Sequence, residues 1–513
     1  MWYHLKRMTR CPRHDSWTYF GLSCAAAHRT LSIMTAESPF PASDDASLEY
    51  SRAQMLAMGQ AVLERSVDHV AAIGSQPSRG NVDAAELCRS LREPIPEAGT
   101  ELEPLLALLF DDLIPRSFTT PSPGYLGYIP GGGVYPAALA DFIADTTNRY
   151  TGVWQAAPAL VQLESNVLEW MCDWMGFPAG SSGLLTTGGS GATFNAVLCA
   201  RERLLGPDIR RGTIYTSSQA HLCIVKAAKL AGIHADRVRL IPVDSAFRMR
   251  LDALKAAIAE DRAAGLVPFL VGSSAGTTNT GAVDALDEIA DLCAAEKLWH
   301  HVDGAYGAFF HACPELRPLL RGLSRADSLT LDPHKGMFLP YGTGALLVRD
   351  ASALRDVHAA TAGYLPESPE EFYDPHQYGP ELSRGFPGLR VWMAVKMYGA
   401  ARYRAAIAEK RALAVWAAER VARIPGIVMD AEPQLSLFAF HLEGPTLATQ
   451  EARNVATAAL VEQVTRRGKV LLSGCTVDGR YLARVCVLSF RTRMEQMETC
   501  VAHLAEEAAK LLA

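Results

Sequence analysis

The sequence predicts an α/β protein whose mainly parallel central sheet is covered by helices and followed by a smaller α+β region. Between residues 183 and 348, short apolar runs alternate with segments of helical periodicity. Parallel strands need a long crossover connection, usually a helix, so this alternation is typical of a parallel sheet. The chain has 513 residues, a length that predicts two or three domains sharing a large core.

Each element follows from an apolar run and the turn residues that bound it. Helical periodicity covers residues 49–73, shorter helices are expected at 83–112, and 135–175 is mostly helical with breaks near Gly152 and Pro158. In the alternating region we expect strands at 183–187, 213–216, 238–242, 269–273, 300–302, 328–331 and 345–348, and helices at 192–205, 221–230, 251–264 and 285–295.

The pattern changes after residue 385. The chain reads as helical to about residue 423, and a final helix is expected at 495–512. Between these helices, strands are expected at 428–430, 436–442, 470–473 and 483–489. Runs of strands beside helices, without strict alternation, indicate a small α+β domain.

These patterns divide the chain into an N-terminal helical segment at 46–134, a large domain at 135–397 and a small domain at 398–513. Residues 1–45 are expected to be a disordered tail, or an extension of a chain that naturally starts at Met34. A targeting peptide is the alternative, because the first 33 residues are basic and contain a single acidic residue, Asp15.

Composition excludes several classes of function. The formal net charge is −6, which gives no global attraction to nucleic acid or anionic membranes. No apolar run reaches the ~18 residues that a membrane-spanning helix needs. The 11 cysteines include no C-x-x-C pair, which favours reduced thiols in the cytoplasm over a disulfide framework or a metal site.

Residues able to do chemistry follow the predicted strands. Gly188, His221, Asp303 and Lys335 all lie at or after strand ends. In open α/β sheets, ligands bind beyond the carboxyl ends of the strands. The sequence therefore predicts one shared site at this edge of the sheet.

Lys335 and Asp303 suggest the cofactor. A lysine amine condenses with carbonyl groups, and an aspartate keeps a pyridine nitrogen protonated. Together these two functions are what pyridoxal phosphate (PLP) requires of a protein. The glycine loop Thr186–Gly191 precedes a predicted helix, and such a loop either serves as a plain turn or holds the phosphate at the helix N-terminus.

The ordered motifs resemble those of the group II PLP-dependent amino-acid decarboxylases, of the aromatic-L-amino-acid decarboxylase type. The similarity covers roughly residues 50–510, and it implies PLP fold type I, the aspartate aminotransferase-like fold. The motifs are GYIPGGGVYPAALADF from Gly127, WQAAPALVQLE from Trp154, GLLTTGGSGAT from Gly183, YTSSQAH from Tyr215, GTTNTGAVD from Gly276, HVDGAYG from His301, DPHKG from Asp332 and LSRGFPGLRVWMAVKMYG from Leu382.

The resemblance assigns roles to individual residues. It makes Lys335 the Schiff-base lysine, Asp303 the partner of the ring nitrogen and His221 the histidine stacked on the ring. It also implies a homodimer with its active site at the subunit interface. On the cofactor side it places Gly189, Ser190 and His334 near the phosphate, Ala305 under the ring and Thr278 near Asp303; on the substrate side it places Tyr128, Ile129 and Trp154, with Tyr150 reaching into the neighbouring pocket.

The chain also departs from the family pattern. Asp332 stands where the family often has asparagine, and Gly336 replaces a bulky residue. Pro375 occupies the place of a loop tyrosine implicated in protonating the substrate carbon. Tyr373 and His376 lie close enough in sequence to substitute, so Tyr373 is a second candidate acid beside His221.

The resemblance implies an enzyme that converts an L-amino acid, expected to be aromatic from Tyr128, Trp154 and Tyr150, to an amine and CO2. Three alternatives stay open. The missing loop tyrosine favours an aldehyde synthase that uses O2 after decarboxylation. A decarboxylase of a non-aromatic amino acid, such as glutamate or 2,4-diaminobutyrate, and a non-catalytic PLP-binding protein are the others.

Overall fold

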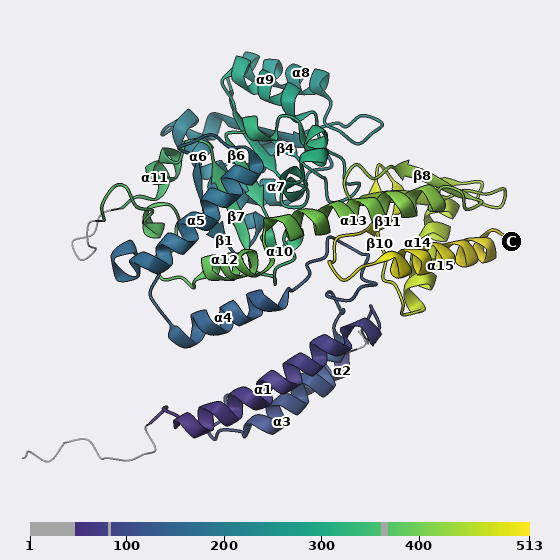
Figure 1. Cartoon of the computed structure of the whole chain (residues 1–513). Helices are drawn as coiled ribbons and strands as arrows, with labels where there is room; N and C mark the ends of the chain where they lie inside the picture. The colour runs from purple at the N-terminus through teal and green to yellow at the C-terminus, as the bar shows by residue number, and fades with distance from the viewer. Residues whose placement is uncertain (1–46, 81–83, 361–367) are drawn as a thin grey trace, which may run out of the picture. The chain divides into compact units, whose positions relative to one another are not determined.

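The computed structural model describes residues 47–80, 84–360 and 368–513. The tail predicted at residues 1–45 lies outside the described residues. The chain divides into two compact units, residues 1–59 and 60–513. The described part of the first unit includes the start of helix α1 (Arg52–Ala72), and the second unit contains the other helices and strands (Figure 1). Among the described residues, no helix has both the length and the apolar character needed to cross a membrane.

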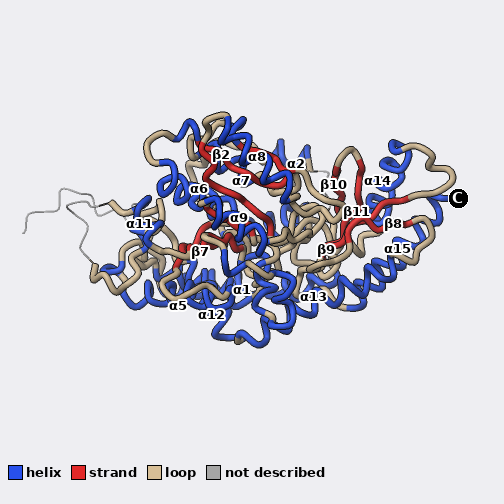
Figure 2. Tube along the Cα trace, turned by 90° about the horizontal axis from the view of Figure 1, so that it is seen from above, coloured by secondary structure: helices blue, strands red, loops and turns tan. Residues whose placement is uncertain are grey.

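A seven-stranded sheet lies in the second unit, residues 60–513 (Figures 1 and 2). Its order is β1-β7-β6-β5-β4-β2-β3. Strand β7 runs antiparallel to both of its neighbours, and the other pairs are parallel. The predicted α/β fold with a mainly parallel sheet is confirmed. The strands are β1 (Ser182–Thr186), β2 (Gly212–Ser217), β3 (Val238–Ile241), β4 (Val267–Ser274), β5 (Trp299–Asp303), β6 (Ser328–Leu331) and β7 (Gly344–Val348).

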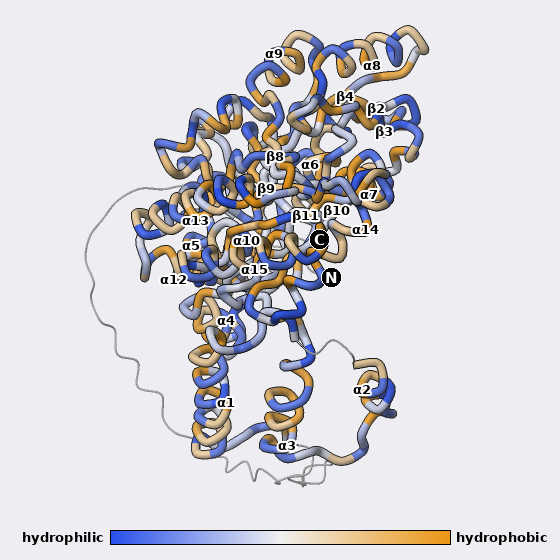
Figure 3. Tube along the Cα trace, turned by 90° about the vertical axis from the view of Figure 1, so that its right-hand side faces the viewer, coloured by the Kyte–Doolittle hydropathy of each residue, from blue (hydrophilic) through white to orange (hydrophobic). Residues whose placement is uncertain are grey.

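The helices between these strands lie where the alternation predicts them. Positions along α8 and α9 alternate between hydrophilic and hydrophobic, as expected for helices with one face on the sheet (Figure 3). The helices of this region are α6 (Gly189–Leu205), α7 (Cys223–Leu230), α8 (Leu251–Ala263), α9 (Leu286–Glu296), α10 (Pro333–Gly336) and α11 (Ser352–His358).

Prolines and glycines set the ends of the preceding helices. The break predicted near Pro158 is the first turn of α5 (Pro158–Met175), where the missing N–H of proline costs no hydrogen bond. Helix α5 ends at Gly176, whose φ of 69° suits glycine. Upstream lie α2 (Ala85–Ser90), α3 (Leu102–Ala107), a π-helical turn (Leu108–Leu113) and α4 (Tyr135–Thr147).

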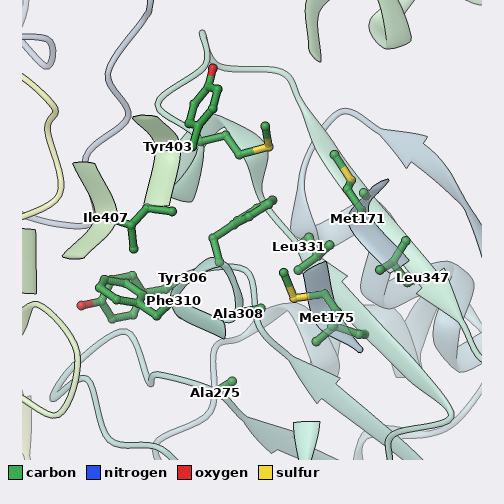
Figure 4. Packing of buried hydrophobic residues seen from close by; sticks show 14 of the residues in the cluster. Met171, Met175, Ala275, Tyr306, Ala308, Phe310, Leu331, Leu347, Tyr403 and Ile407 are labelled. Carbon is green, nitrogen blue, oxygen red and sulfur yellow. The ribbon is translucent and has the colours of Figure 1, made fainter. Parts of the chain in front are cut away.

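The main hydrophobic core joins α5, the sheet and α13 (Ala400–Val421). Met171 and Met175 of α5 meet Leu331 and Leu347 of the sheet, and Ile407 of α13 belongs to the same cluster (Figure 4). Helix α13 follows α12 (Pro387–Tyr398) and leads into the C-terminal region. Because one apolar cluster spans these elements, the sheet is held on this face by helices that precede and follow its strands in the chain.

The C-terminal region contains a four-stranded antiparallel sheet of order β10-β11-β9-β8, as the α+β pattern predicts. The strand predicted at 470–473 forms only in part: Leu471 makes an isolated parallel bridge with Tyr125, and β10 begins at Ser473. The prediction also missed α14, whose N-terminus is capped by Thr449 Oγ1 accepting the Ala452 N–H at 3.2 Å. The elements are β8 (Ile427–Ala431), β9 (Leu437–Leu442), α14 (Gln450–Arg466), β10 (Ser473–Val477), β11 (Arg480–Cys486) and α15 (Met494–Leu512).

Lys410 of α13 is a titratable side chain buried inside the protein. Its side chain is 0 % exposed, and Nζ donates to the Thr492 carbonyl oxygen at 2.6 Å. Burial lowers the pKa of Lys410 to about 8, from an ordinary value of 10.5. Between these two values the unfolded chain binds more protons than the folded one, so this group makes stability rise with pH.

Replacing Lys410 by methionine tests this effect. We expect the unfolding free energy of the wild type to gain up to about 3 kcal/mol relative to Lys410→Met between pH 8 and 10.5. Denaturation midpoints measured at several pH values check it, with Lys229→Met as a control on an exposed face of α7. Parallel pH curves for wild type and Lys410→Met contradict the prediction.

Candidate active site

The strand ends of the large sheet enclose a cavity of about 300 Å³. Because β5 and β6 are parallel neighbours, the residues that follow them emerge at the same edge. The structure brings all the predicted cofactor-side residues to this cavity. They are Gly189, Ser190, His221, Thr278, Asp303, Ala305, His334 and Lys335.

Lys335 projects into the cavity from the short helix α10. Its side chain is 24 % exposed, and Nζ lies 2.7 Å from Asp332 Oδ2. Burial by itself lowers the pKa of Lys335, but the nearby Asp332 carboxylate, helped by Asp303, holds that pKa above its ordinary value. Lys335 is therefore an ammonium group paired with a carboxylate in this structure.

Asp303 lies at the end of β5 with both carboxylate oxygens engaged. Oδ1 accepts the Ala305 N–H at 3.1 Å, and Oδ2 accepts from Cys223 Sγ at 3.6 Å. The preceding His301 is buried, which lowers its pKa to about 4, and it bonds Ser328 and Thr330 of β6. A neutral histidine behind Asp303 thus supports the strand end, and the carboxylate faces the cavity.

His221 stands at the mouth of the cavity, just before α7, which begins two residues later than predicted. Its Nδ1 accepts the Cys223 backbone N–H at 3.2 Å. A ring nitrogen that accepts has no proton, so the neutral ring carries its proton on Nε2. His221 therefore has a donor available on its other nitrogen.

The glycine loop forms an anion site at the start of α6. Gly191 and Ala192 donate back to the Gly188 carbonyl oxygen, whereas the N–H groups of Gly189 and Ser190 have no intrahelical acceptor. Space is tight here, since a Cβ on Gly189 would lie 3.2 Å from both Ala305 Cβ and Asp332 Oδ2. These free donors at the end of a 17-residue helix attract a phosphate.

His334 and Thr278 complete the walls of the cavity. His334 Nδ1 donates to the Thr343 carbonyl oxygen at 2.7 Å, and burial lowers the pKa of His334, so its ring is neutral. Thr278 is fixed through its backbone, because its carbonyl oxygen accepts from the Arg484 guanidinium of β11. The four-stranded sheet thereby helps to shape the cavity at the edge of the seven-stranded sheet.

The predicted substrate-side aromatic residues do not line this cavity, although Ile129 does. Tyr128 and Tyr150 are 54 % and 41 % exposed, and Tyr150 Oη donates to the Leu382 carbonyl oxygen at 3.1 Å. Trp154 stacks on Phe372, with ring centroids 4.6 Å apart. Their roles in substrate binding stay predictions.

Tyr373 also lies away from the cavity. It is 8 % exposed, belongs to the hydrophobic core and packs on Tyr378 with ring centroids 4.8 Å apart. Burial raises the pKa of Tyr373 far above its ordinary value. The neighbouring His376 is held by Asp374, at 2.9 Å. Neither side chain reaches Lys335 in this structure, and the proposed acid role of Tyr373 stays a prediction.

Sequence reasoning missed Cys223. Its thiol lies between Asp303 and Thr193, 3.6 Å from each, and lines the cavity. The donor atoms of His221, Cys223 and Asp303 lie within 4.8 Å of one another, a grouping that also suits a metal ion. The only sequence signal was the position of Cys223 two residues after His221.

Comparison with known proteins identifies the family of this chain. The pyridoxal-dependent decarboxylase conserved domain matches residues 86–443. The chain belongs to the pyridoxal-dependent decarboxylase family. It is a PLP-dependent amino-acid decarboxylase with PLP as its cofactor.

Alignments with related proteins cover nearly the whole length of this decarboxylase. The aromatic-L-amino-acid decarboxylase of Bacillus atrophaeus is 34 % identical over 458 residues, covering 88 % of this chain and 95 % of that protein. Histidine decarboxylase of Mus musculus is 28 % identical over 487 residues, covering 90 % of this chain and 71 % of that protein.

Solved structures share the fold. Oryza sativa TDC with PLP and tryptamine has a TM-score of 0.87 and 25 % identity, covering 91 % of this chain and 100 % of that chain. Rhodiola rosea 4-hydroxyphenylacetaldehyde synthase has a TM-score of 0.84 and 25 % identity, covering 90 % of this chain and 99 % of that chain. The predicted fold type is thus confirmed.

The cavity of the decarboxylase fits PLP. Lys335 offers the amine for the aldehyde, Asp303 a carboxylate for the ring nitrogen, and the Gly189 and Ser190 N–H groups the donors for the phosphate. The buried Asp332 Oδ1, which has no hydrogen-bond partner in the described part of the chain, marks a polar wall beside that cradle.

Gly336, next to Lys335, has a steric explanation. A Cβ at this position would lie 2.6 Å from Phe309 Cδ2 and 2.7 Å from Phe309 Cβ. Phe309 is fully buried, so its ring occupies the space that a larger side chain would need. The departure at Gly336 is therefore matched by a bulky residue packed against it.

The variant Gly336→Ala should destabilise the decarboxylase by about 1–3 kcal/mol, because Phe309 has no room to move in the packed core. Thermal unfolding measures the loss, and Gly99→Ala serves as control because a Cβ there meets nothing within 4 Å. Equal stabilities of the two variants contradict this account of Gly336.

Proposed function

We propose that this decarboxylase acts on an aromatic L-amino acid and releases the amine and CO2. The observation that carries the proposal is the position of His221, at the mouth of the same cavity as Lys335 and Asp303, with its free proton on Nε2. The 34 % identity to an aromatic-L-amino-acid decarboxylase supports the substrate class.

The chain's own residues bind and orient the reactants. When bound, PLP supplies an electron sink for the electrons released as the carboxylate leaves. The Asp303 carboxylate would hold a proton at the ring nitrogen, and the N–H groups of Gly189 and Ser190 would hold the phosphate. Ala305, Thr278 and His334 bound the space around the ring.

His221 is the stronger candidate for donating a proton to the substrate Cα. Its Nδ1 is fixed by the Cys223 N–H, so Nε2 presents the proton. Tyr373 is the second candidate, but it must leave the core to reach the cavity, because it packs on Tyr378. The His221 assignment needs no such movement.

We also propose that two copies of the chain form the functional enzyme. Phe142 and Ile143 of α4 are 63 % and 43 % exposed, which is unusual for large apolar side chains on adjacent positions of one helix. Tyr128 and Tyr150 are exposed outside the cavity of their own chain. A second copy covering these side chains is consistent with their predicted place beside a neighbouring pocket.

A cytoplasmic location is proposed from the cysteines. The nine cysteines in the described part of the chain are all free thiols. Disulfides form and persist in oxidising compartments, so unpaired cysteines of this number favour a reducing one.

A panel of L-amino acids with CO2, amine and peroxide measured together tests the substrate and the product. We expect aromatic substrates to give equal amounts of CO2 and amine. Pro375 at the place of the loop tyrosine favours the rival aldehyde synthase, which would consume O2 and form peroxide. Peroxide equal to CO2 would overturn the amine assignment, and turnover confined to glutamate or 2,4-diaminobutyrate would overturn the aromatic one.

Mixing two inactive variants tests the shared site. Lys335→Ala lacks the cofactor lysine, and Tyr150→Ala lacks the side chain proposed to enter the neighbouring pocket. Co-refolded subunits should regain up to about a quarter of wild-type activity. About half of the dimers formed from equal amounts are mixed, and in each mixed dimer one of the two sites has both groups. If each variant stays inactive in the mixture, Tyr150 does not act across an interface.

A further inference from the structure

Asp332 is a buried carboxylate that the proposed function leaves without a task. It is 2 % exposed, and its Oδ1 has no hydrogen-bond partner among the described residues. It occupies the N-cap position of α10, but its side chain accepts no capping hydrogen bond. Instead Oδ2 lies 2.7 Å from Lys335 Nζ and 3.7 Å from His334 Nε2.

The surroundings of Lys335 make Asp332 its dominant partner. A buried carboxylate needs a compensating charge, and the Lys335 ammonium is the cation within contact distance. The other ionisable groups that act on Lys335 come from β5, α7, α10 and β11. They are the Asp303 carboxylate, the Cys223 and Cys486 thiols, which burial keeps protonated, and the neutral His334 ring.

Protonation of Lys335 opposes its covalent chemistry. To bond the aldehyde carbon of PLP, Nζ needs a free electron pair, so the ammonium first gives one proton to solvent. The amine nitrogen then bonds the carbon, and the aldehyde oxygen leaves as water with the two remaining amine hydrogens. A carboxylate that holds the ammonium form slows the first step.

We propose that Asp332 is a positioning residue that holds Lys335 as an ammonium in the cofactor-free enzyme and makes covalent capture of PLP dependent on pH. The proposal rests on the proposed role of Lys335 as the cofactor lysine. An asparagine at this position keeps the shape and removes the charge. Asp332 thus acts on cofactor loading, a step separate from decarboxylation.

The test compares full-length wild type and Asp332→Asn after removal of the cofactor. Covalent capture of added PLP is followed by its absorbance change from pH 6 to 10. We expect Asp332→Asn to capture PLP about ten-fold faster at pH 7, with the rise of its rate shifted at least about one unit toward lower pH. The ionisations of free PLP affect both proteins equally, so they cancel when the two rate profiles are compared. Superimposable rate profiles overturn the proposal.

A probe without an aldehyde separates capture from binding. Pyridoxine 5′-phosphate occupies the cavity but forms no bond to Lys335, so its dissociation constant reports the fold and the phosphate site. We expect Asp332→Asn to bind it with the same affinity as wild type. If the faster capture is accompanied by an equal gain in affinity for this probe, the effect lies in phosphate attraction and the proposal is overturned.

Wild-type protein provides a second measurement if Asp332→Asn fails to fold. Reductive methylation of Lys335 in the cofactor-free enzyme, quantified by mass spectrometry, should keep rising with pH to about 10. A plateau below pH 9 overturns the proposal. Lys335→Ala is the separate control for the cofactor assignment. Capture of PLP by that variant refutes the role of Lys335 and the proposal with it, whereas superimposable wild-type and Asp332→Asn profiles overturn the proposal alone.

Discussion

A largely buried positive charge needs anions around it, and the site of this decarboxylase is built on that constraint. Lys335 meets the Asp332 carboxylate at 2.7 Å, and Asp303 adds a second negative charge from the neighbouring strand. These groups come together because β5 and β6 are adjacent and parallel, so both end at the same edge. The topology of the sheet thus sets the electrostatics of the site.

The same edge of the sheet also presents hydrogen-bond donors with positive partial charge, close to these carboxylates. The start of α6 presents the N–H groups of Gly189 and Ser190, which favour an anion. Asp332 lies between this anion site and Lys335, since a Cβ on Gly189 would lie 3.2 Å from its Oδ2. A carboxylate beside a phosphate site opposes anion binding unless a cation neutralises it, and Lys335 is that cation before the cofactor arrives.

Much of the region around the seven-stranded sheet could be predicted from the sequence, because the burial of its strands follows local apolar patterns. Buried parallel strands appear as apolar runs, and the turn residues between them mark the start of each helix. The C-terminal region was harder. The apolar run from Val470 to Leu472 contributes only an isolated bridge between Leu471 and Tyr125, and α14 carries mixed residues whose helical start is marked mainly by Thr449.

The sequence by itself determined the fold class and the residues at the strand ends, because a strand end fixes where the next side chains emerge. Tertiary structure decided the rest. It moved Tyr373 into the core, left Tyr128 and Tyr150 exposed, and placed the unsuspected Cys223 against Asp303. These residues lie on loops and helix starts, whose side chains point where packing with distant elements allows. It also showed that Asp332, a departure from the family pattern, is the ion-pair partner of Lys335. Only the folded chain shows which oxygen faces which nitrogen.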